Sequence, residues 1–224
     1  MLVAVTGFAQ QKADTLHSQV FSFSPASRKL EKVNGMSLGI GHSWSDRTPK
    51  KINGLNVEVN PATSLIILFQ DPDRVHNDSV QMTVNGLHLS AGGFSGRIKL
   101  NGVGISVYNI AYATNGFSVT GLYNVNIKLN GLHISGLSNS AEEARGLLIA
   151  GVNNADDFGG ACIGIYNRSV DMKGLSIGLI NINENKMAGL HIGIFNKTGN
   201  SRGLQIGLWN INSKRSLPFI NWHN

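Results

Sequence analysis

The sequence has little of the material that several classes of protein need. Cys162 is the only cysteine in 224 residues, so neither an intrachain disulfide nor a zinc site built on several cysteines can form. Charged residues make up 14%, against roughly 25% in an average soluble domain. The five prolines and a glycine pattern without a three-residue period exclude collagen. No run of 18 apolar residues occurs, so we predict no transmembrane helix.

Glycine and asparagine are abundant instead, with 27 and 25 residues. A hydrophobic content of 42% argues against intrinsic disorder, and the combination with low charge is typical of turn-rich β structure. The net charge of +6 comes from dispersed lysines and arginines. Nucleic-acid sites cluster such residues among stacking aromatics, so we predict no nucleic-acid partner.

The main signal is an internal repeat. Two clear copies run from Gly189 to Asn196 (GLHIGIFN) and from Gly203 to Asn210 (GLQIGLWN). Glycines that open the units, spaced by 14 to 16 residues, stand at positions 86, 102, 116, 131, 146, 160, 174, 189 and 203. Degenerate copies open at Gly35, Gly54 and Gly86. A period this regular indicates a stacked or repeated architecture.

Each unit alternates in the manner of a strand with one buried face. Leu190, Ile192 and Ile194 stand at every second position and alternate with His191, Gly193 and Phe195, which predicts that the three aliphatic residues face the core and that His191 faces solvent. The opening glycine and the closing asparagine tolerate left-handed backbone, so we expect both at corners.

Two all-β architectures fit this unit. In a parallel β-solenoid (a β-roll or β-helix), each unit of 14 to 15 residues is one coil. In an antiparallel β-meander or barrel, pairs such as Asn130-Gly131 are hairpin turns. The solenoid is favoured because every copy keeps the same strand while the return segment becomes polar, and stacking of identical strands explains that difference.

The chain divides into four regions. Residues 1–10 have the apolar run and small residues of a signal-peptide remnant. Residues 11–84 are predicted to form an N-terminal cap and irregular repeats, including an apolar run at 64–69. Residues 85–210 form the regular repeat array, and residues 211–224 a C-terminal cap, because an open solenoid end must be covered.

Two columns of side chains are candidate functional features. The closing residues Asn109, Asn124, Asn139, Asn167, Asn181, Asn196 and Asn210 are predicted to stack as a structural amide column, with a ligand-binding polar stripe as the alternative. The residues before four of them, Tyr166, Ile180, Phe195 and Trp209, form either a partner-binding ladder or part of the core.

Catalytic and metal-binding signatures are weak. Gly174-Leu-Ser-Ile-Gly178 and Gly35-Met-Ser-Leu-Gly39 match the G-x-S-x-G nucleophile motif, but both serines lie within repeat strands instead of a strand-to-helix turn. His88, His133 and His191 share one repeat position several coils apart, too far to bind one metal, and are interpreted as solvated. We therefore predict a protein that is not an enzyme, without catalytic, cofactor-binding or metal-binding residues.

Units such as GLQIGLWN (203–210), together with the ending KRSLPFINW (214–222), resemble uncharacterised exported surface-repeat proteins of Gram-negative bacteria. The resemblance implies export to the periplasm, outer membrane or cell surface. The expected function is that of a non-enzymatic cell-envelope or surface repeat protein with a structural or binding role, its partner being a glycan or an envelope component. An outer-membrane β-barrel and a polysaccharide-active β-helix enzyme are the alternatives.

Overall fold

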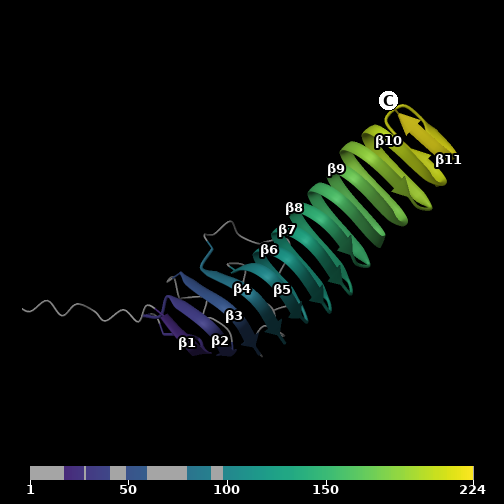
Figure 1. Cartoon of the computed structure of the whole chain (residues 1–224). Helices are drawn as coiled ribbons and strands as arrows, with labels where there is room; N and C mark the ends of the chain where they lie inside the picture. The colour runs from purple at the N-terminus through teal and green to yellow at the C-terminus, as the bar shows by residue number, and fades with distance from the viewer. Residues whose placement is uncertain (1–17, 28, 41–48, 60–79, 92–97, 224) are drawn as a thin grey trace, which may run out of the picture.

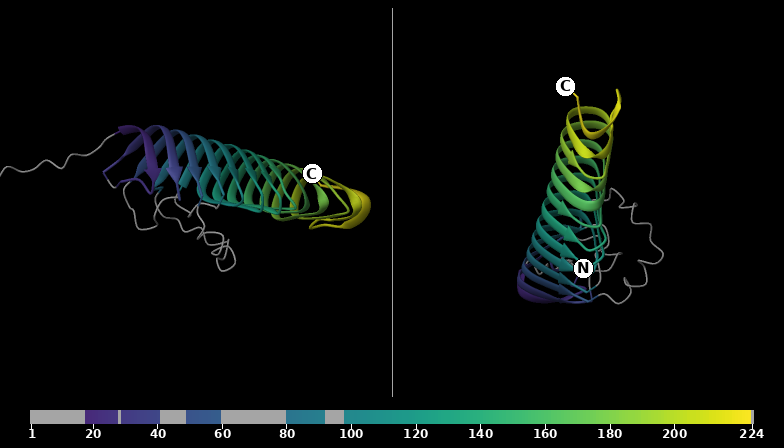
Figure 2. Two further views of the ribbon diagram at one scale, coloured as in Figure 1. Left: turned by 90° about the horizontal axis from the view of Figure 1, so that it is seen from below. Right: turned by 90° about the vertical axis from the view of Figure 1, so that its right-hand side faces the viewer.

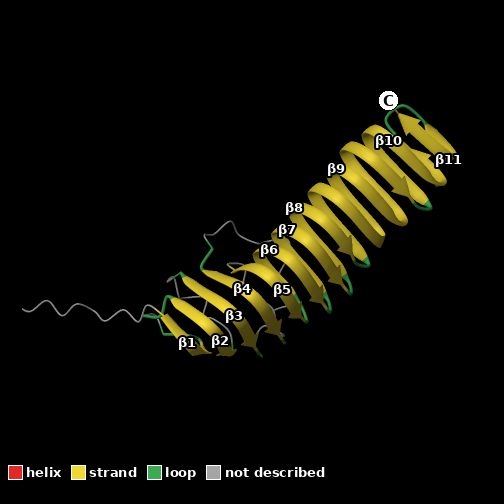
Figure 3. Ribbon diagram, viewed as in Figure 1, coloured by secondary structure: helices red, strands yellow, loops and turns green. Residues whose placement is uncertain are grey.

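The computed structural model describes residues 18–27, 29–40, 49–59, 80–91 and 98–223, and it is a parallel β-solenoid in which one repeat unit forms one coil. The coils stack into an elongated rod with the first strands at one end and the C-terminus at the other (Figures 1 and 3). The strands are β1 (Ser18–Ser24), β2 (Lys32–Gly39), β3 (Lys50–Glu58), β4 (Met82–Ser90), β5 (Ile98–Ser106), β6 (Asn109–Thr120), β7 (Tyr123–Ser135), β8 (Ser138–Ile149), β9 (Val152–Ile192), β10 (Phe195–Ile211) and β11 (Ser216–His223).

The register confirms the solenoid. Strands β1 to β10 pair in sequence order and in parallel, with equivalent repeat positions side by side; Gly86 pairs with Gly102, for example, and Gly102 with Gly116. The antiparallel alternative is wrong for this part of the chain, because Asn-Gly pairs such as Asn130-Gly131 lie inside strands and do not form hairpin turns. Among the described residues, no helix is long and apolar enough to span a membrane.

The opening glycines form one column along the rod. Gly86 is the central residue of β4, with a φ of 131°, a value that side-chain-bearing residues rarely adopt. A Cβ on Gly86 would overlap the carbonyl oxygen of Gly54 in the preceding coil, and the same contact recurs at each later glycine of the column. The glycines therefore do not end the strands, as the sequence suggested; they bend each strand in its middle and allow the coils to approach closely.

The apolar core lies against the half of each strand that precedes the glycine. In β4 this half buries Met82 and Val84, and in β5 it buries Ile98 and Leu100. Further along the rod the same side of the interior is filled by Leu129, Ala144, Phe158 and Met172. Each coil contributes only a few such side chains, and they form two clusters along the rod, one from Ala26 to Ala111 and one from Leu129 to Met172. Figure 2 shows the stacked coils that enclose them from two further directions.

The C-terminal end of the rod is closed by a hairpin. β11 turns back and pairs antiparallel with β10, unlike all the earlier strand pairs. Arg215 fixes this turn, since its guanidinium donates to Asn221 Oδ1 at 3.0 Å and to the Trp222 carbonyl at 2.6 Å and lies 4.6 Å from the Trp222 ring centroid. At the other end β1 continues the parallel register, so the region 11–84 includes regular coils. The predicted leader at 1–10 and the apolar run at 64–69 lie outside the described residues.

The glycine column predicts a selective sensitivity to an added methyl group. Gly131→Ala places a Cβ against the carbonyl oxygen of Gly116 at a φ of 126°, and we expect it to lower the free energy of unfolding by more than about 2 kcal/mol in urea denaturation. Gly104→Ala is the control, because Gly104 lacks the left-handed φ and its Cβ would meet no backbone atom of the neighbouring coils, only Leu100 Cδ2 at 2.7 Å and Ser118 Cβ at 3.7 Å. Equal losses in both variants would contradict this role of the column.

Candidate binding face

The half of each strand that follows the glycine carries apolar residues on the outside of the rod. These residues align in two columns that run from β1 to β11 without a polar member, and together we call them the apolar face. Column 1 is Phe21, Met36, Leu55, Leu87, Val103, Phe117, Leu132, Leu147, Ala161, Leu175, Leu190, Leu204 and Trp222. Column 2 is Phe23, Leu38, Val57, Leu89, Ile105, Val119, Ile134, Ile149, Ile163, Ile177, Ile192, Ile206 and Ile220.

This orientation reverses one sequence prediction. Leu190, Ile192 and Ile194 were expected in the core, but Ile194 is 50% exposed and the other two lie on the apolar face. Many members of the face are more than a third exposed; Ile105, for example, is 47% exposed. The expectation that apolar residues of a half-buried strand point inward is therefore wrong for this half of the coil.

The sequence contains a signal that accounts for the reversal. In β4 the apolar residues Val84 and Leu87 are three positions apart, across Asn85-Gly86. A strand that continues through Gly86 keeps its two-residue period, so Val84 and Leu87 must point to opposite sides. Treating Gly86 as a corner removes this constraint, and the orientation of the second half is then assigned wrongly.

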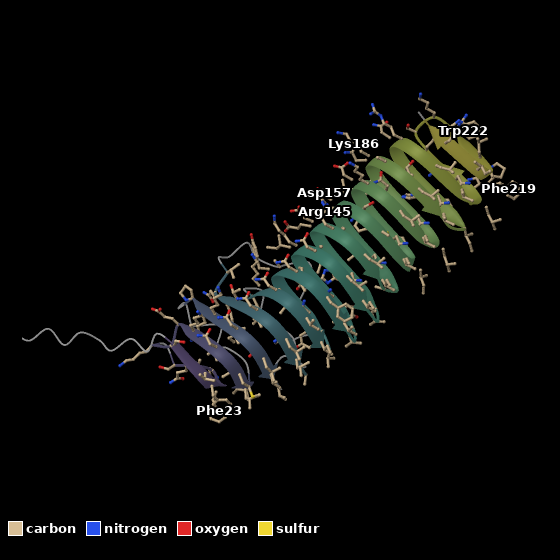
Figure 4. All side chains as sticks on the ribbon, viewed as in Figure 1. Phe23, Arg145, Asp157, Lys186, Phe219 and Trp222 are labelled. Carbon is tan, nitrogen blue, oxygen red and sulfur yellow. The ribbon has the colours of Figure 1, made fainter. Side chains whose placement is uncertain are left out.

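A groove deepens the apolar face near the C-terminus. It has a volume of about 900 Å³ and lies between Ile163, Ile177, Ile192 and Ile206 of column 2 and a third row, Ile165, Leu179, Ile194 and Leu208. Phe219 and Ile220 of β11 close one end of the groove. Phe219 has a φ of 66°, the one side-chain-bearing residue with positive φ in the described part of the chain, and Figure 4 shows its side chain projecting from the end of the rod.

The residues Tyr166, Ile180, Phe195 and Trp209, for which the core and a partner-binding ladder were the two alternatives, lie beside this groove. Ile180 pairs with Phe195 in register, and each of the four residues precedes an asparagine that is hydrogen bonded to the next coil. Ile180 is 38% and Trp209 48% exposed, while Tyr166 and Phe195 are partly buried. They therefore widen the apolar surface at its edge and do not belong to the core.

Inside the same strands, the column between the two outer columns is mostly polar. Its members, at most 7% exposed where they carry a side chain, are Ser22, Ser37, Asn56, His88, Gly104, Ser118, His133, Leu148, Cys162, Ser176, His191, Gln205 and Asn221. The interpretation of the three histidines as solvated is wrong, since each is at most 1% exposed. The reversed strand orientation is the reason, because it turns this position inward.

The buried histidines are held in their neutral form. Burial lowers the pKa of His133 and of His191 from about 6.5 to about 4, and it does so for His88 although the nearby Glu58 carboxylate acts in the opposite direction. His133 Nδ1 lies 2.8 Å from Ser118 Oγ, and His191 Nε2 lies 3.2 Å from Met172 Sδ. These contacts describe packed interior histidines.

A ladder of buried asparagines runs through the interior. The seven predicted residues lie in one column, and Asn153 completes it between Asn139 and Asn167. Each Nδ2 donates to the Oδ1 of the next coil at 2.8 to 3.1 Å, from Asn109 to Asn210. The sequence analysis omitted this unit's asparagine because the unit ends in two of them, Asn153 and Asn154, and the sequence does not show which one enters the column. Asn154 instead accepts a hydrogen bond from Arg168. The buried position leaves no surface for a ligand-binding stripe.

The ladder helps to explain the second glycine of the repeat. A Cβ on Gly178 or on Gly193 would lie 2.5 or 2.3 Å from the carbonyl oxygen of the glycine in the preceding coil, and 2.6 Å from the ladder amide of Asn167 or of Asn181. The close approach of the backbones and the amide both exclude a side chain here. Glycine at this position therefore makes room for the amide column.

A second row of asparagines, partly exposed, precedes the glycine column. Its side chains are linked from coil to coil by Nδ2 to Oδ1 hydrogen bonds of 2.7 to 2.9 Å, and its members are Asn34, Asn53, Asn85, Asn101, Asn115 and Asn130.

The serines of the two G-x-S-x-G matches lie inside the coils. Ser176 is 2% exposed, accepts from Cys162 Sγ at 3.2 Å and donates to Asn181 Oδ1 at 2.6 Å. Ser37 is 1% exposed. Burial raises the pKa of the Cys162 thiol to about 11. Across the described ranges no group of three or more His, Cys, Asp or Glu side chains is placed to hold a metal ion.

Comparison with known proteins adds no relative to this geometry. No family model matches the sequence, and no curated protein or solved structure matches it.

The neutral histidines predict a loss of stability in mild acid. Their folded-state pKa of about 4 lies below the unfolded value of about 6.5, so the unfolded chain binds protons that the folded chain excludes. The free energy of unfolding is then highest above pH 6.5. Between pH 6.5 and pH 4 it falls by about 1 kcal/mol per pH unit for each histidine.

His133→Leu tests this dependence, because Leu148 occupies the same column position in the next coil. Urea denaturation at pH 7 and pH 5 should show a smaller acid-induced loss in the variant than in the wild type. An unchanged pH profile would show that His133 contributes nothing to it.

The amide ladder predicts that substituting a buried asparagine lowers the free energy of unfolding more than substituting an asparagine of the outer row. Asn167→Asp removes an Nδ2 that donates to Ile177 O and to Asn181 Oδ1, both at 2.9 Å, and places a carboxylate in the interior. We expect a loss of about 3 kcal/mol in urea denaturation, against less than about 1 kcal/mol for Asn101→Asp in the outer row. Similar losses at both positions would argue against a special role of the inner ladder.

Proposed function

We propose that this protein is a non-enzymatic repeat protein of the cell envelope or cell surface, exported to that location, where its apolar face serves a structural or binding role. The face is the observation that carries the proposal. With about 4.8 Å between strands and about 7 Å between columns, the apolar face measures roughly 60 Å by 12 Å, or about 700 Å². The largest apolar patch on a typical monomer is about 300 to 600 Å².

Two further observations support a binding or structural role. The candidate nucleophile Ser176 and the three histidines are buried and engaged in the interior, where a substrate has no access. The repeated hydrogen-bonded ladders give a rod whose outer surface repeats coil after coil, as extended binding surfaces do. The exported location is supported by the leader-like pattern at residues 1–10 and by the resemblance to surface-repeat proteins.

Fractionation of the source cells, with immunoblotting of each fraction, tests the proposal. We expect the wild-type protein in the envelope fraction. In a variant carrying Ile105→Asp and Ile163→Asp, the amount of protein in the soluble fraction should rise by at least about 10-fold over the wild type, since charged groups on the face oppose apolar contact. Thr83→Asp with Ser140→Asp adds the same charge outside the face and should leave the distribution unchanged. Wild-type protein in the cytosol would contradict the export proposal, and retention of the face variant would contradict the role of the face.

A further inference from the structure

The apolar face has the size and chemistry of half a protein interface. Two copies of a surface of about 700 Å² bury roughly 1,400 Å² in total, within the range of about 1,200 to 2,000 Å² for specific, stable complexes. Neither outer column contains a charged or polar side chain. Two chains of net charge +6 can therefore bring these faces together with little charge in the contact, the exception being the Arg215 guanidinium that lies against the Trp222 ring at the C-terminal end.

The charged side chains lie elsewhere on the rod. Figure 4 shows Phe23 and Phe219 on one side of the molecule, at its two ends, and Arg145, Asp157 and Lys186 along the opposite side. Arg145 pairs there with Asp157, and Lys128 with Glu143 at 2.9 Å. The two outer columns of the apolar face run from β1 to β11, so a partner that covers only one end would leave most of the face in water.

A second copy of the chain matches that length and pitch. Its side chains are spaced by the same strand-to-strand distance of about 4.8 Å, so one contact repeats in every coil. The groove of about 900 Å³ lies between two parallel rows of aliphatic residues, and an aliphatic row with the same spacing fits between them. Stacked β-sheets pack in this way, with about 10 Å between the sheets.

The C-terminal end of the rod disfavours end-to-end association, which leaves the apolar face on the side of the rod as the surface for contact. β11 is the terminal strand, and Pro218 within it has no N–H to offer to a further strand. Addition of another rod to this edge is therefore disfavoured. A face-to-face contact between identical surfaces is isologous and closes at two copies.

We propose that this protein is a homodimer in which two rods pack apolar face against apolar face. The dimer rests on the binding role that the proposed function gives to the apolar face and names a second copy of the chain as the binding partner. It does not depend on export or on an envelope location, so it is tested with the purified chain. Sedimentation equilibrium at micromolar protein should give twice the chain mass of 24.0 kDa. Ile105→Lys with Ile163→Lys should weaken the dimer by at least about 100-fold, because both charges would be buried in the contact.

The matched control is Thr83→Lys with Ser140→Lys, which adds the same charge outside the apolar face and should remain dimeric. Circular dichroism of each variant establishes that the strand structure is retained. A monomeric wild type would overturn the proposal, and so would a face variant that is folded and still dimeric. Binding of a monomeric wild type to phospholipid vesicles would assign the face to a lipid surface instead.

Discussion

The rod depends on the requirement that every coil follow the backbone of the coil before it. Parallel pairing brings each strand to the same repeat position of its neighbour, and at the glycine column the contact is so close that a Cβ would overlap the preceding carbonyl oxygen. Because Gly102 and Gly116 both adopt a positive φ, of 138° and 119°, each strand bends at the same place. The bend then determines which side chains enter the interior and which face solvent.

The interior combines two kinds of stabilisation that are usually kept apart. One half of each coil contributes small and aliphatic side chains such as Leu129 and Ala144, and the other contributes histidine, serine and asparagine. The asparagine ladder of the polar half is paired from coil to coil; the Asn181 amide, for example, donates to both Ile192 O and Asn196 Oδ1. His133 Nε2 and His191 Nδ1, by contrast, are buried without a hydrogen-bond partner among the described residues. An apolar outer face is the counterpart of this polar interior, since consecutive residues of a strand point to opposite sides.

The architecture could be predicted from the sequence, whereas the orientation of its strands could not be predicted by the same reasoning. The regular spacing of units such as those at Gly189 and Gly203, each with the same strand, was sufficient for a parallel solenoid. Alternation within Leu190, His191 and Ile192 shows only that neighbours point to opposite sides, and hydrophobicity was then used to decide which side is inside. That choice fails here because the asparagine ladder makes polar neighbours such as Ser176 favourable in the interior. Only the three-residue step between Val84 and Leu87 carried the missing information.

Between them, the outer asparagine row and the inner ladder link neighbouring coils by side-chain hydrogen bonds from Asn34 to Asn210. The outer row ends at Asn130, and the inner ladder has already begun at Asn109, so the two overlap between these residues. Each coil in the second half meets the same amide and the same glycine on both sides. Gain or loss of one whole coil by gene duplication or deletion would therefore recreate contacts that already exist. Length is consequently the property of this protein that evolution can change most easily, and the reach of the rod can vary while its cross-section stays constant.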